Sequence, residues 1–154
     1  MNIEIIKIDE EIKVIGLSFK KLGLSYEEAN ILEKMWDIYG EKYRNNIKNA
    51  VTPLVEYGIN ICLPESRDEY ISGCAVTEIT DLDENFISFV IPSGKYMKIS
   101  CHGMDNMSAL FEVDSGSLAE ENGVKIDSNF MIEIYPEGAF EGKDVEISIL
   151  YPTR

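Results

Sequence analysis

Hydrophobic and polar residues alternate near the start of the chain, and this pattern predicts a strand over roughly residues 3–20. The acidic run of residues 9–11 interrupts the alternation, so we expect a turn or a β-bulge there. Two further strands are predicted over residues 57–63 and 70–79, because both stretches are rich in hydrophobic and β-branched side chains. Residues 64–68 lie between them and have the composition of a turn.

Between the strands predicted over residues 3–20 and 57–63, the spacing of hydrophobic residues changes from alternation to steps of three and four. Hydrophobic side chains recur at steps of three and four residues from Ile31 to Tyr39, which is typical of an amphipathic helix. Ser25 and Glu28 have the spacing of a capping box, in which each side chain bonds the backbone amide of the other residue. We therefore expect a helix that begins near Ser25 and runs to about Tyr43.

The second half of the chain repeats this order. Residues 86–100 form another long β-rich segment, which we expect to bend at the proline and glycine within residues 92–94. A helical pattern follows over residues 107–118, and a glycine within it predicts two short helical pieces. Strands over residues 130–135 and 145–150 complete the order.

The two halves, about residues 1–80 and 85–154, thus show the same order of strand, helix, strand and strand. A short internal repeat supports this interpretation, because residues 57–64 and 129–136 are both strands that end in a bulky residue followed by proline. Two such units would pack around a pseudo-twofold axis and leave a cleft between them. We predict an α+β fold, a single domain over residues 1–154, in which duplicated strand-helix-strand-strand units form an antiparallel sheet with a central ligand cleft.

Composition narrows the classes of partner. Acidic residues outnumber basic ones by 28 to 14, and the formal net charge is −14. Such a field repels nucleic acid and anionic membranes and favours cationic partners. No apolar run is long enough to cross a membrane, the N-terminus lacks the pattern of a signal peptide, and the first strand begins too early for a preceding DNA-binding domain. We expect a cytoplasmic protein that binds neither nucleic acid nor membranes directly.

Several kinds of chemistry lack the residues they require. The sequence has no glycine-rich phosphate-binding loop, and His102 is its only histidine. Cys62, Cys74 and Cys101 are widely spaced and form no Cys-x-x-Cys pair, so neither a metal site nor a redox site is indicated. We expect no metal and no resident cofactor, and we expect the three cysteines to pack in the core.

One carboxylate occupies an unusual position. In the strand predicted near the end of the chain, alternation places Met131, Glu133 and Tyr135 on one face and hydrophobic residues on the other. An unpaired charge inside the core is costly, so Glu133 must be paired, protonated or held for a ligand. In one interpretation it simply faces water, or pairs with a lysine such as Lys95 or Lys98.

In the other interpretation Glu133 is a pocket carboxylate among aromatic side chains. Trp36 is the only tryptophan and lies on the hydrophobic stripe of the first helix, while Tyr57, Tyr70 and Tyr135 lie on or beside predicted strands. Each aromatic residue alone is equally compatible with core packing. Together with Glu133 they would suit an organic cation, because charge pairing and cation–π attraction each contribute about 1–2 kcal/mol when desolvated.

These residues belong to a series of short motifs that resembles the GyrI-like effector-binding domain family, which includes the effector-binding domains of bacterial transcription activators (AraC/Rob-type and BmrR-like) and is related to SOUL proteins. The motifs span nearly the whole chain. In order, they are Val14-Ile15-Gly16-Leu17, Met35-Trp36, Tyr57-Gly58-Ile59, Glu69-Tyr70-Ile71-Ser72-Gly73, Ile91-Pro92-Ser93-Gly94-Lys95-Tyr96 and Glu133-Ile134-Tyr135.

The resemblance implies a central cleft that binds small, often lipophilic and cationic molecules. It implies that Glu133 is the pocket carboxylate and that the cleft walls include Trp36, Tyr57, Tyr70 and Tyr135. Late in the second helix the family often carries a tryptophan or a Leu-Pro step, where this chain has Ser117-Leu118-Ala119-Glu120. One wall of the cleft therefore differs from the family pattern.

Three functions are compatible with these observations. The leading hypothesis is a regulator-like domain without catalytic activity that senses or sequesters a hydrophobic, often cationic molecule. Alternatively, apolar surroundings raise the pKa of Glu133, which then acts as a general acid or base while water hydrolyses a reactive small molecule. A third hypothesis is an acidic, gyrase-inhibitor-like protein that binds a basic protein partner.

Overall fold

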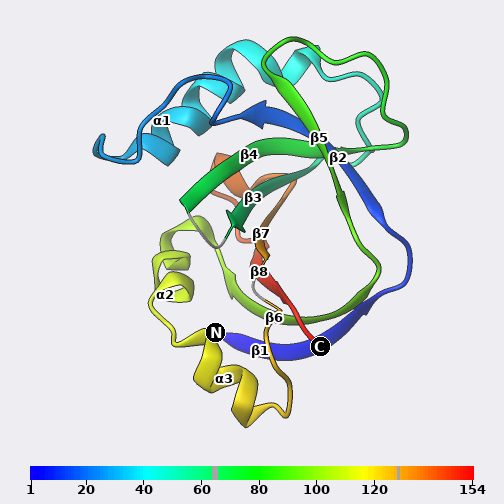
Figure 1. The fold of residues 1–154 in the computed structure, drawn as a ribbon. Helices are drawn as coiled ribbons and strands as arrows, with labels where there is room; N and C mark the ends of the chain where they lie inside the picture. Colours follow the sequence, from blue (N-terminus) through cyan, green and yellow to red (C-terminus); the bar gives the residue numbers. More distant parts are fainter. Residues whose placement is uncertain (64–65, 128) are drawn as a thin grey trace.

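The structure is a computed structural model that describes residues 1–63, 66–127 and 129–154. The first predicted strand forms as two strands, β1 (Asn2–Ile8) and β2 (Ile12–Ser18), and the interruption falls at the acidic run, as expected. Figure 1 shows them as one sweep that crosses the molecule from β1 to β2. The acidic turn therefore joins two parts of the same long, bent strand.

The first helix begins later than the sequence predicts. α1 (Ile31–Ile38) follows Asn30, whose φ of 57° is left-handed, and the capping box expected at Ser25 is absent from this helix start. The Ser25 hydroxyl instead accepts a hydrogen bond from the backbone amide of Glu27 in an exposed turn. A left-handed residue cannot continue a right-handed helix, so this turn stays separate from α1. At its other end the helical path continues through a π-helical turn, Tyr39–Tyr43, which confirms the predicted end.

The remaining predicted strands all form. They are β3 (Val55–Leu63), β4 (Ser66–Val76), β5 (Phe86–Ile91), β6 (Gly94–His102), β7 (Phe130–Pro136) and β8 (Glu146–Pro152). β4 begins earlier than predicted, so residues 66–68 of the expected turn belong to a strand, and residues 64–65 lie outside the described residues. The bend expected at 92–94 separates β5 from β6.

The second helical region consists of two short pieces, as the interrupted pattern predicts. They are α2 (Ser108–Phe111) and α3 (Ser115–Glu121). Asp114 caps α3, because its carboxylate accepts a hydrogen bond from the backbone amide of Ser117 at 3.1 Å. A 3-10 turn, Ala139–Glu141, follows β7 and precedes β8.

The eight strands form one antiparallel sheet in the order β1-β6-β8-β7-β3-β4-β2-β5. The order is symmetric about its centre: β1 and β5 lie at the two edges, β6 and β2 lie next to them, β8 and β4 follow, and β7 and β3 meet in the middle. Each pair joins equivalent strands of the two halves, which is the pseudo-twofold arrangement predicted from the repeat. The equivalent strands β3 and β7 pair at the centre, where Gly58 lies opposite Glu133. α1 lies toward one end of the molecule, and α2 and α3 lie toward the other (Figure 1).

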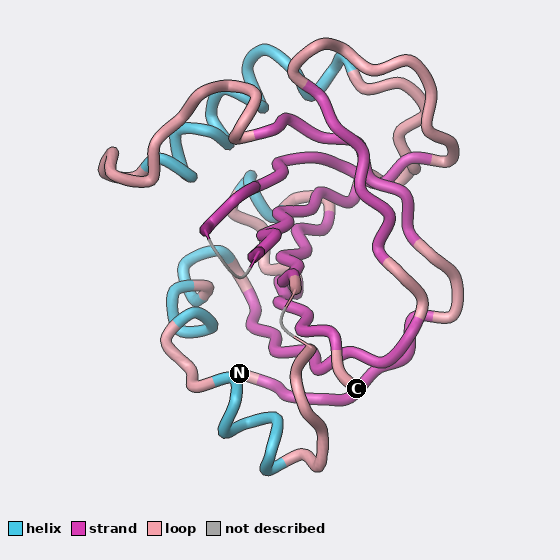
Figure 2. The backbone as a smooth tube through the Cα atoms, in the orientation of Figure 1, coloured by secondary structure: helices cyan, strands magenta, loops and turns pink. Residues whose placement is uncertain are grey.

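Three clusters of buried side chains form the core. One lies beneath α1 and includes Met35, and a second lies beneath α2 and α3 and includes Leu110. Trp36 packs against both clusters, so it lies at their junction. The third cluster, which includes Ile59, receives hydrophobic side chains from every strand and none from α1, α2 or α3. The sheet therefore curls around this third cluster, and the tube in Figure 2 shows the curled strands.

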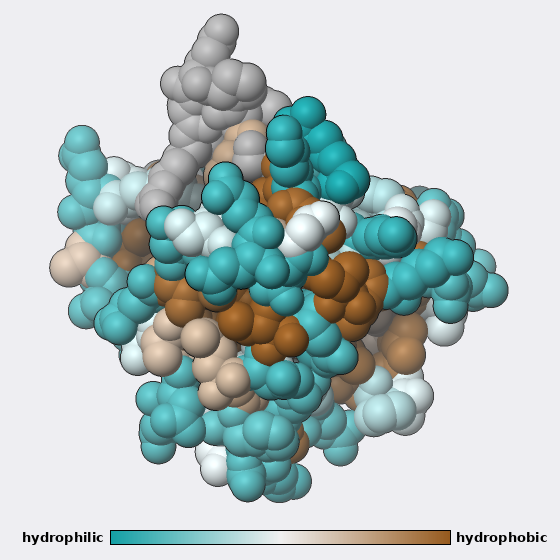
Figure 3. Space-filling model, turned by 90° about the horizontal axis from the view of Figure 1, so that it is seen from below, coloured by the Kyte–Doolittle hydropathy of each residue, from teal (hydrophilic) through white to brown (hydrophobic). Residues whose placement is uncertain are grey.

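One face of the surface combines hydrophobic and hydrophilic regions. On the face shown in Figure 3, hydrophobic side chains gather near the middle and hydrophilic ones surround them. Among the residues that the structure describes, no helix is both long enough and apolar enough to cross a membrane.

Candidate functional site

Glu133 is a buried carboxylate at the centre of the sheet. Strand alternation on β7 turns its side chain toward the helices, and only 3% of the residue is exposed. The pairing of β7 with β3 brings Asn60 and Gly58 to the same side, and β4 adds Tyr70 from the next strand. Residues far apart in sequence therefore surround one carboxylate.

Neutral donors satisfy this carboxylate. The hydroxyls of Tyr70 and Tyr135 donate to Glu133 Oε1 at 2.7 and 2.6 Å, and Asn60 Nδ2 donates to Oε2 at 3.0 Å. Trp36 Nε1 in turn donates to the Tyr70 hydroxyl at 2.9 Å, which fixes the direction in which Tyr70 donates. No basic side chain within the described parts of the chain forms an ion pair with Glu133.

Burial dominates the electrostatics of this group. Desolvation raises the pKa of Glu133, and the hydrogen bonds from Tyr135, Tyr70 and Asn60 oppose that rise. Burial, followed by the nearby charge of Glu133, holds the pKa values of Tyr70 and Tyr135 well above the ordinary tyrosine value. Both hydroxyls therefore remain protonated at neutral pH and act as donors. The site holds a carboxylate whose charge is only partly compensated.

Glycine at position 58 leaves room for this network. A Cβ atom built on Gly58 would lie 2.3 Å from the Tyr70 hydroxyl oxygen and 2.5 Å from Glu133 Oε1. Any larger residue would push these two side chains apart, because real Cβ contacts are not this short. Gly58 is therefore required for the hydrogen bond between Tyr70 and Glu133.

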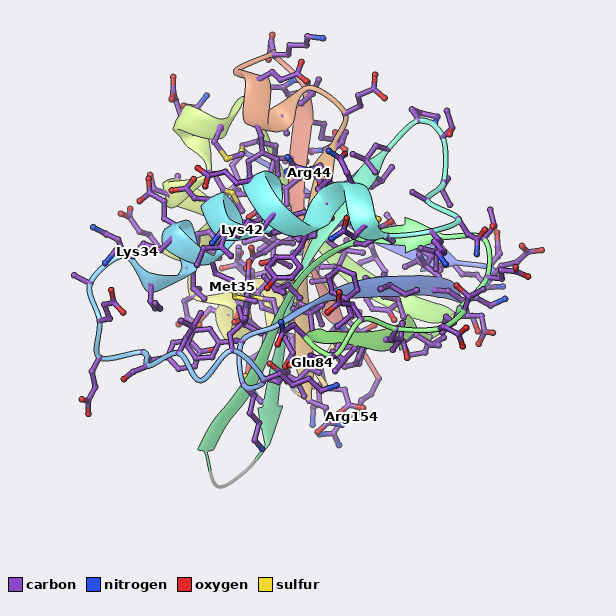
Figure 4. The ribbon with its side chains drawn as sticks, turned by 90° about the horizontal axis from the view of Figure 1, so that it is seen from above. Lys34, Met35, Lys42, Arg44, Glu84 and Arg154 are labelled. Carbon is purple, nitrogen blue, oxygen red and sulfur yellow. The ribbon has the colours of Figure 1, made fainter. Side chains whose placement is uncertain are left out.

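A second buried carboxylate provides an internal comparison. Glu56, also on β3, is 6% exposed, and it accepts a hydrogen bond from Arg44 Nε at 2.8 Å. Figure 4 shows Arg44 in the helical segment that follows α1. Its guanidinium also lies over the rings of Tyr39 and Phe140, at 5.1 and 5.9 Å from their centroids. The fold thus supplies Glu56, but not Glu133, with a cation of its own.

A cavity of about 350 Å³ opens beside Glu133. Its walls combine aromatic, aliphatic and acidic side chains: Leu32, Glu33, Trp36, Asn60, Tyr70, Phe111, Met131, Glu133 and Tyr135. Phe111 is 50% exposed, so an aromatic ring at this cavity is accessible to a ligand. The Trp36 ring is held edge-on against Tyr135 with their centroids 5.3 Å apart. We refer to this cavity as the Glu133 lobe.

The structure brings together four of the five predicted site residues. Glu133, Trp36, Tyr70 and Tyr135 all line the Glu133 lobe. Tyr57 does not, because it alternates with Gly58 along β3 and packs in the third core cluster on the opposite face of the sheet. Burial raises the pKa of Tyr57 to about 12 in that position.

In the described part of the chain, Glu133 neither pairs with a lysine nor faces water, which were the alternative interpretations of its position in the sequence. Lys98 pairs instead with Glu146 at 2.5 Å and with Glu4 at 3.6 Å, and within the described chain no ion pair joins Lys95 to Glu133. The low exposure of Glu133 also contradicts a side chain that simply faces water.

Sequence reasoning missed the cavity residues Leu32, Glu33, Phe111 and Met131, and it missed two neighbours that shape the Glu133 network. Asn60 bonds Glu133, and Gly58 makes room for it, yet neither was predicted. A signal was present, because alternation with Tyr57 places both residues on the face opposite that ring. Recognising it required knowing that β3 pairs with β7.

A comparison with protein families identifies the fold. The family model described as "Integron-associated effector binding protein" matches residues 4–152. The chain belongs to this family. The predicted resemblance to GyrI-like effector-binding domains is therefore confirmed, and so is the α+β fold built on an antiparallel sheet. A comparison with curated proteins gave no match.

Solved structures resemble this effector-binding domain at low sequence identity. The C-terminal domain of EcmrR has 16% identity and a TM-score of 0.71, with 99% of this chain and 97% of that chain covered. SAV2435 bound to tetraphenylphosphonium has 14% identity and a TM-score of 0.66, with 100% and 94% covered. A protein described as a hydrolase from Listeria innocua has 12% identity and a TM-score of 0.57, with 99% and 92% covered. At these identities the likeness shows a common fold.

Proposed function

We propose that this effector-binding domain binds a hydrophobic organic cation in the Glu133 lobe. The observation that carries the proposal is the contrast between two buried carboxylates. Glu56 has Arg44 as its counter-charge, whereas Glu133 has neutral hydrogen-bond donors and an adjoining cavity. A cation in that cavity would supply the missing charge.

The walls of the cavity suit an organic cation better than a metal ion. Trp36, Tyr135 and Phe111 offer aromatic surface, which attracts a cation over the ring face by about 0.5–2 kcal/mol per contact. Glu33 adds a second acidic side chain at the same cavity. The net charge of −14 further favours the approach of cations over anions.

The bound structure of SAV2435 supports the same ligand class, since its ligand, tetraphenylphosphonium, is a hydrophobic cation. The fold is related to the C-terminal domain of EcmrR, and EcmrR itself has been solved in a complex with DNA, which supports a regulator-like role. We infer that the domain senses or sequesters its ligand.

Thermal unfolding with a matched pair of ions tests the proposal. Tetraphenylphosphonium and tetraphenylborate have the same shape and opposite charge. At about 100 times its Kd, the cation should stabilise the domain by about 2.7 kcal/mol, which is roughly 5–10 °C at this size. The anion should leave the melting temperature unchanged.

Two variants assign the effect to the carboxylate. Glu133→Gln should lower the affinity for tetraphenylphosphonium about 10-fold to 100-fold, because it removes the charge–charge attraction between the carboxylate and the phosphonium. Glu120→Gln is the matched control, since it removes the same charge from an exposed position on α3. Equal affinity in wild type and Glu133→Gln, or equal stabilisation by the two ions, would refute the proposal.

A second candidate function rests on the raised pKa of Glu133. A buried carboxyl flanked by two tyrosine hydroxyls can exchange a proton with a bound molecule, and water would then be the attacking nucleophile. The fold relation to the Listeria innocua hydrolase supports this alternative. Mass spectrometry of a cationic ester such as benzoylcholine after incubation separates the two functions, because only hydrolysis converts the ester and water to benzoate and choline, and Glu133→Gln should abolish that turnover.

A further inference from the structure

A second cavity adjoins the Glu133 lobe. It has a volume of about 260 Å³, and it shares Asn60 and Met131 with the first cavity. These two residues lie opposite each other on β3 and β7, so together they form the border between the cavities.

The second cavity offers an apolar surface rather than a charge. Its walls include Ile126, Met131 and Tyr151, which pack against the core cluster beneath α2 and α3. Glu69 is the single charged residue among its described walls, and its carboxylate is already bonded within the protein. Oε2 accepts from the Ser18 hydroxyl at 2.7 Å, and Oε1 accepts from the backbone amides of Lys20 and Tyr70 at 3.0 and 3.1 Å. Glu69 is also partly exposed to solvent, so its charge is less desolvated than that of Glu133, and the apolar walls of this cavity suit the uncharged part of a ligand.

The border between the two cavities consists of one fixed side chain and one that can move. Asn60 is held by its hydrogen bond to Glu133 Oε2, so it keeps its place when the charged lobe is intact. Met131 is unbranched and polarizable, and such a side chain can change rotamer at low cost to admit a chain of methylenes. The Glu133 lobe alone is near the lower end of the range for ligand sites, about 300–1,000 Å³, and the two lobes together lie well inside it.

We propose that the ligand is an elongated amphipathic cation, whose charged head lies at Glu133 and whose apolar body passes Asn60 and Met131 into the second cavity. This inference rests on the proposed function, since it takes the Glu133 lobe as the site of the head. It restricts the ligand class from hydrophobic cations in general to cations that carry one long apolar arm. The structure thus assigns charge selection to one lobe and length selection to the other.

A homologous series tests the length selection. Ethyl-, butyl- and octyltrimethylammonium share one head group, and their binding can be followed below micellar concentrations by the fluorescence of Trp36, the only tryptophan. Affinity should rise by about fourfold for each methylene that enters the second lobe, which is the fold-change expected for a fully buried CH₂. Constant affinity along the series would overturn the inference.

Cys62 provides a probe inside the second lobe without any mutation. The expectation that all three cysteines pack in the core is wrong for Cys62, which is exposed at the end of β3 and lines that lobe, whereas Cys74 and Cys101 are buried. Octyltrimethylammonium should protect Cys62 from N-ethylmaleimide, and ethyltrimethylammonium should not. Conversely, protein alkylated at Cys62 should bind the ethyl compound normally and lose the gain in affinity for the octyl compound. Cys62→Ser treated with the same reagent is the matched control, and it should keep that gain.

The outcomes distinguish this inference from the proposed function. If the short cation binds in a Glu133-dependent manner but length has no effect and the octyl compound does not protect Cys62, the second lobe is refuted and the charged site stands. If none of these cations and no tetraphenylphosphonium binds, both proposals fail.

Discussion

The most informative perturbation is the removal of the Glu133 charge, because we expect it to raise the free energy of unfolding. A raised pKa in the folded state means that the native protein binds more protons than the unfolded chain between the two pKa values. The free energy of unfolding then falls as pH rises from the unfolded value, about 4.5, through the native pKa. Ionised Glu133 therefore costs stability near neutral pH.

The structure indicates that glutamine can replace this carboxylate without loss of packing. A glutamine oxygen can accept from both Tyr70 and Tyr135, as Glu133 Oε1 does, and the Asn60 amide can rotate so that its oxygen meets the new NH₂ group. The variant thus keeps the network and loses the desolvated charge. Glu133→Gln should be as stable as wild type in acid and more stable above the native pKa of Glu133.

The magnitude follows from proton linkage. A single group changes the free energy of unfolding by at most about 1.4 kcal/mol per pH unit inside its window. At this chain length, each kcal/mol of stability corresponds to about 2–4 °C in melting temperature. The assay is urea denaturation of wild type and Glu133→Gln between pH 4 and pH 9, plotted as the difference between them, so that other titrating groups cancel.

Two results would refute this reasoning. Parallel stability curves for the two proteins would show that the pKa of Glu133 is not raised by folding. A variant that is less stable than wild type at neutral pH would show that the ionised carboxylate stabilises the fold. Glu120→Gln on exposed α3 serves as the control and should follow the wild-type curve.

Three further predictions concern the two buried carboxylates, Glu133 and Glu56. Gly58→Ala should destabilise the domain by about 1–3 kcal/mol in urea denaturation, because its Cβ would overlap the Tyr70 hydroxyl; unchanged stability would contradict the close packing. Trp36→Phe removes the N–H that bonds Tyr70, and calorimetry should show a several-fold loss of affinity for tetraphenylphosphonium. Arg44→Met leaves buried Glu56 unpaired and should cost about 2–4 kcal/mol, whereas the double variant with Glu56→Gln should recover part of that loss; additive effects would refute the pairing.

Local patterns in the sequence were sufficient to predict the elements and one half of the site. Alternation located the strands, the bend after β1 and the face of β7 that carries Glu133 and Tyr135. It failed at the start of α1, where Asn30 adopts a left-handed conformation that the Ser25 capping spacing does not reveal. A short pattern measures only the relation of a residue to its neighbours in the chain.

The partners of Glu133 depended on pairings between distant strands. Asn60 reaches it across 73 residues of sequence and Tyr70 across 63, through the register of β3 with β7 and with β4. The same register turned Tyr57 to the opposite face.

Sequence alone determined which residue types were available: two acids that become buried, the aromatic side chains and an excess of negative charge. Tertiary structure decided that Arg44 neutralises Glu56 and that Glu133 lies open to a cavity. The physical reason is that charge compensation depends on distance in space, and only packing sets the distance between residues that lie far apart along the chain.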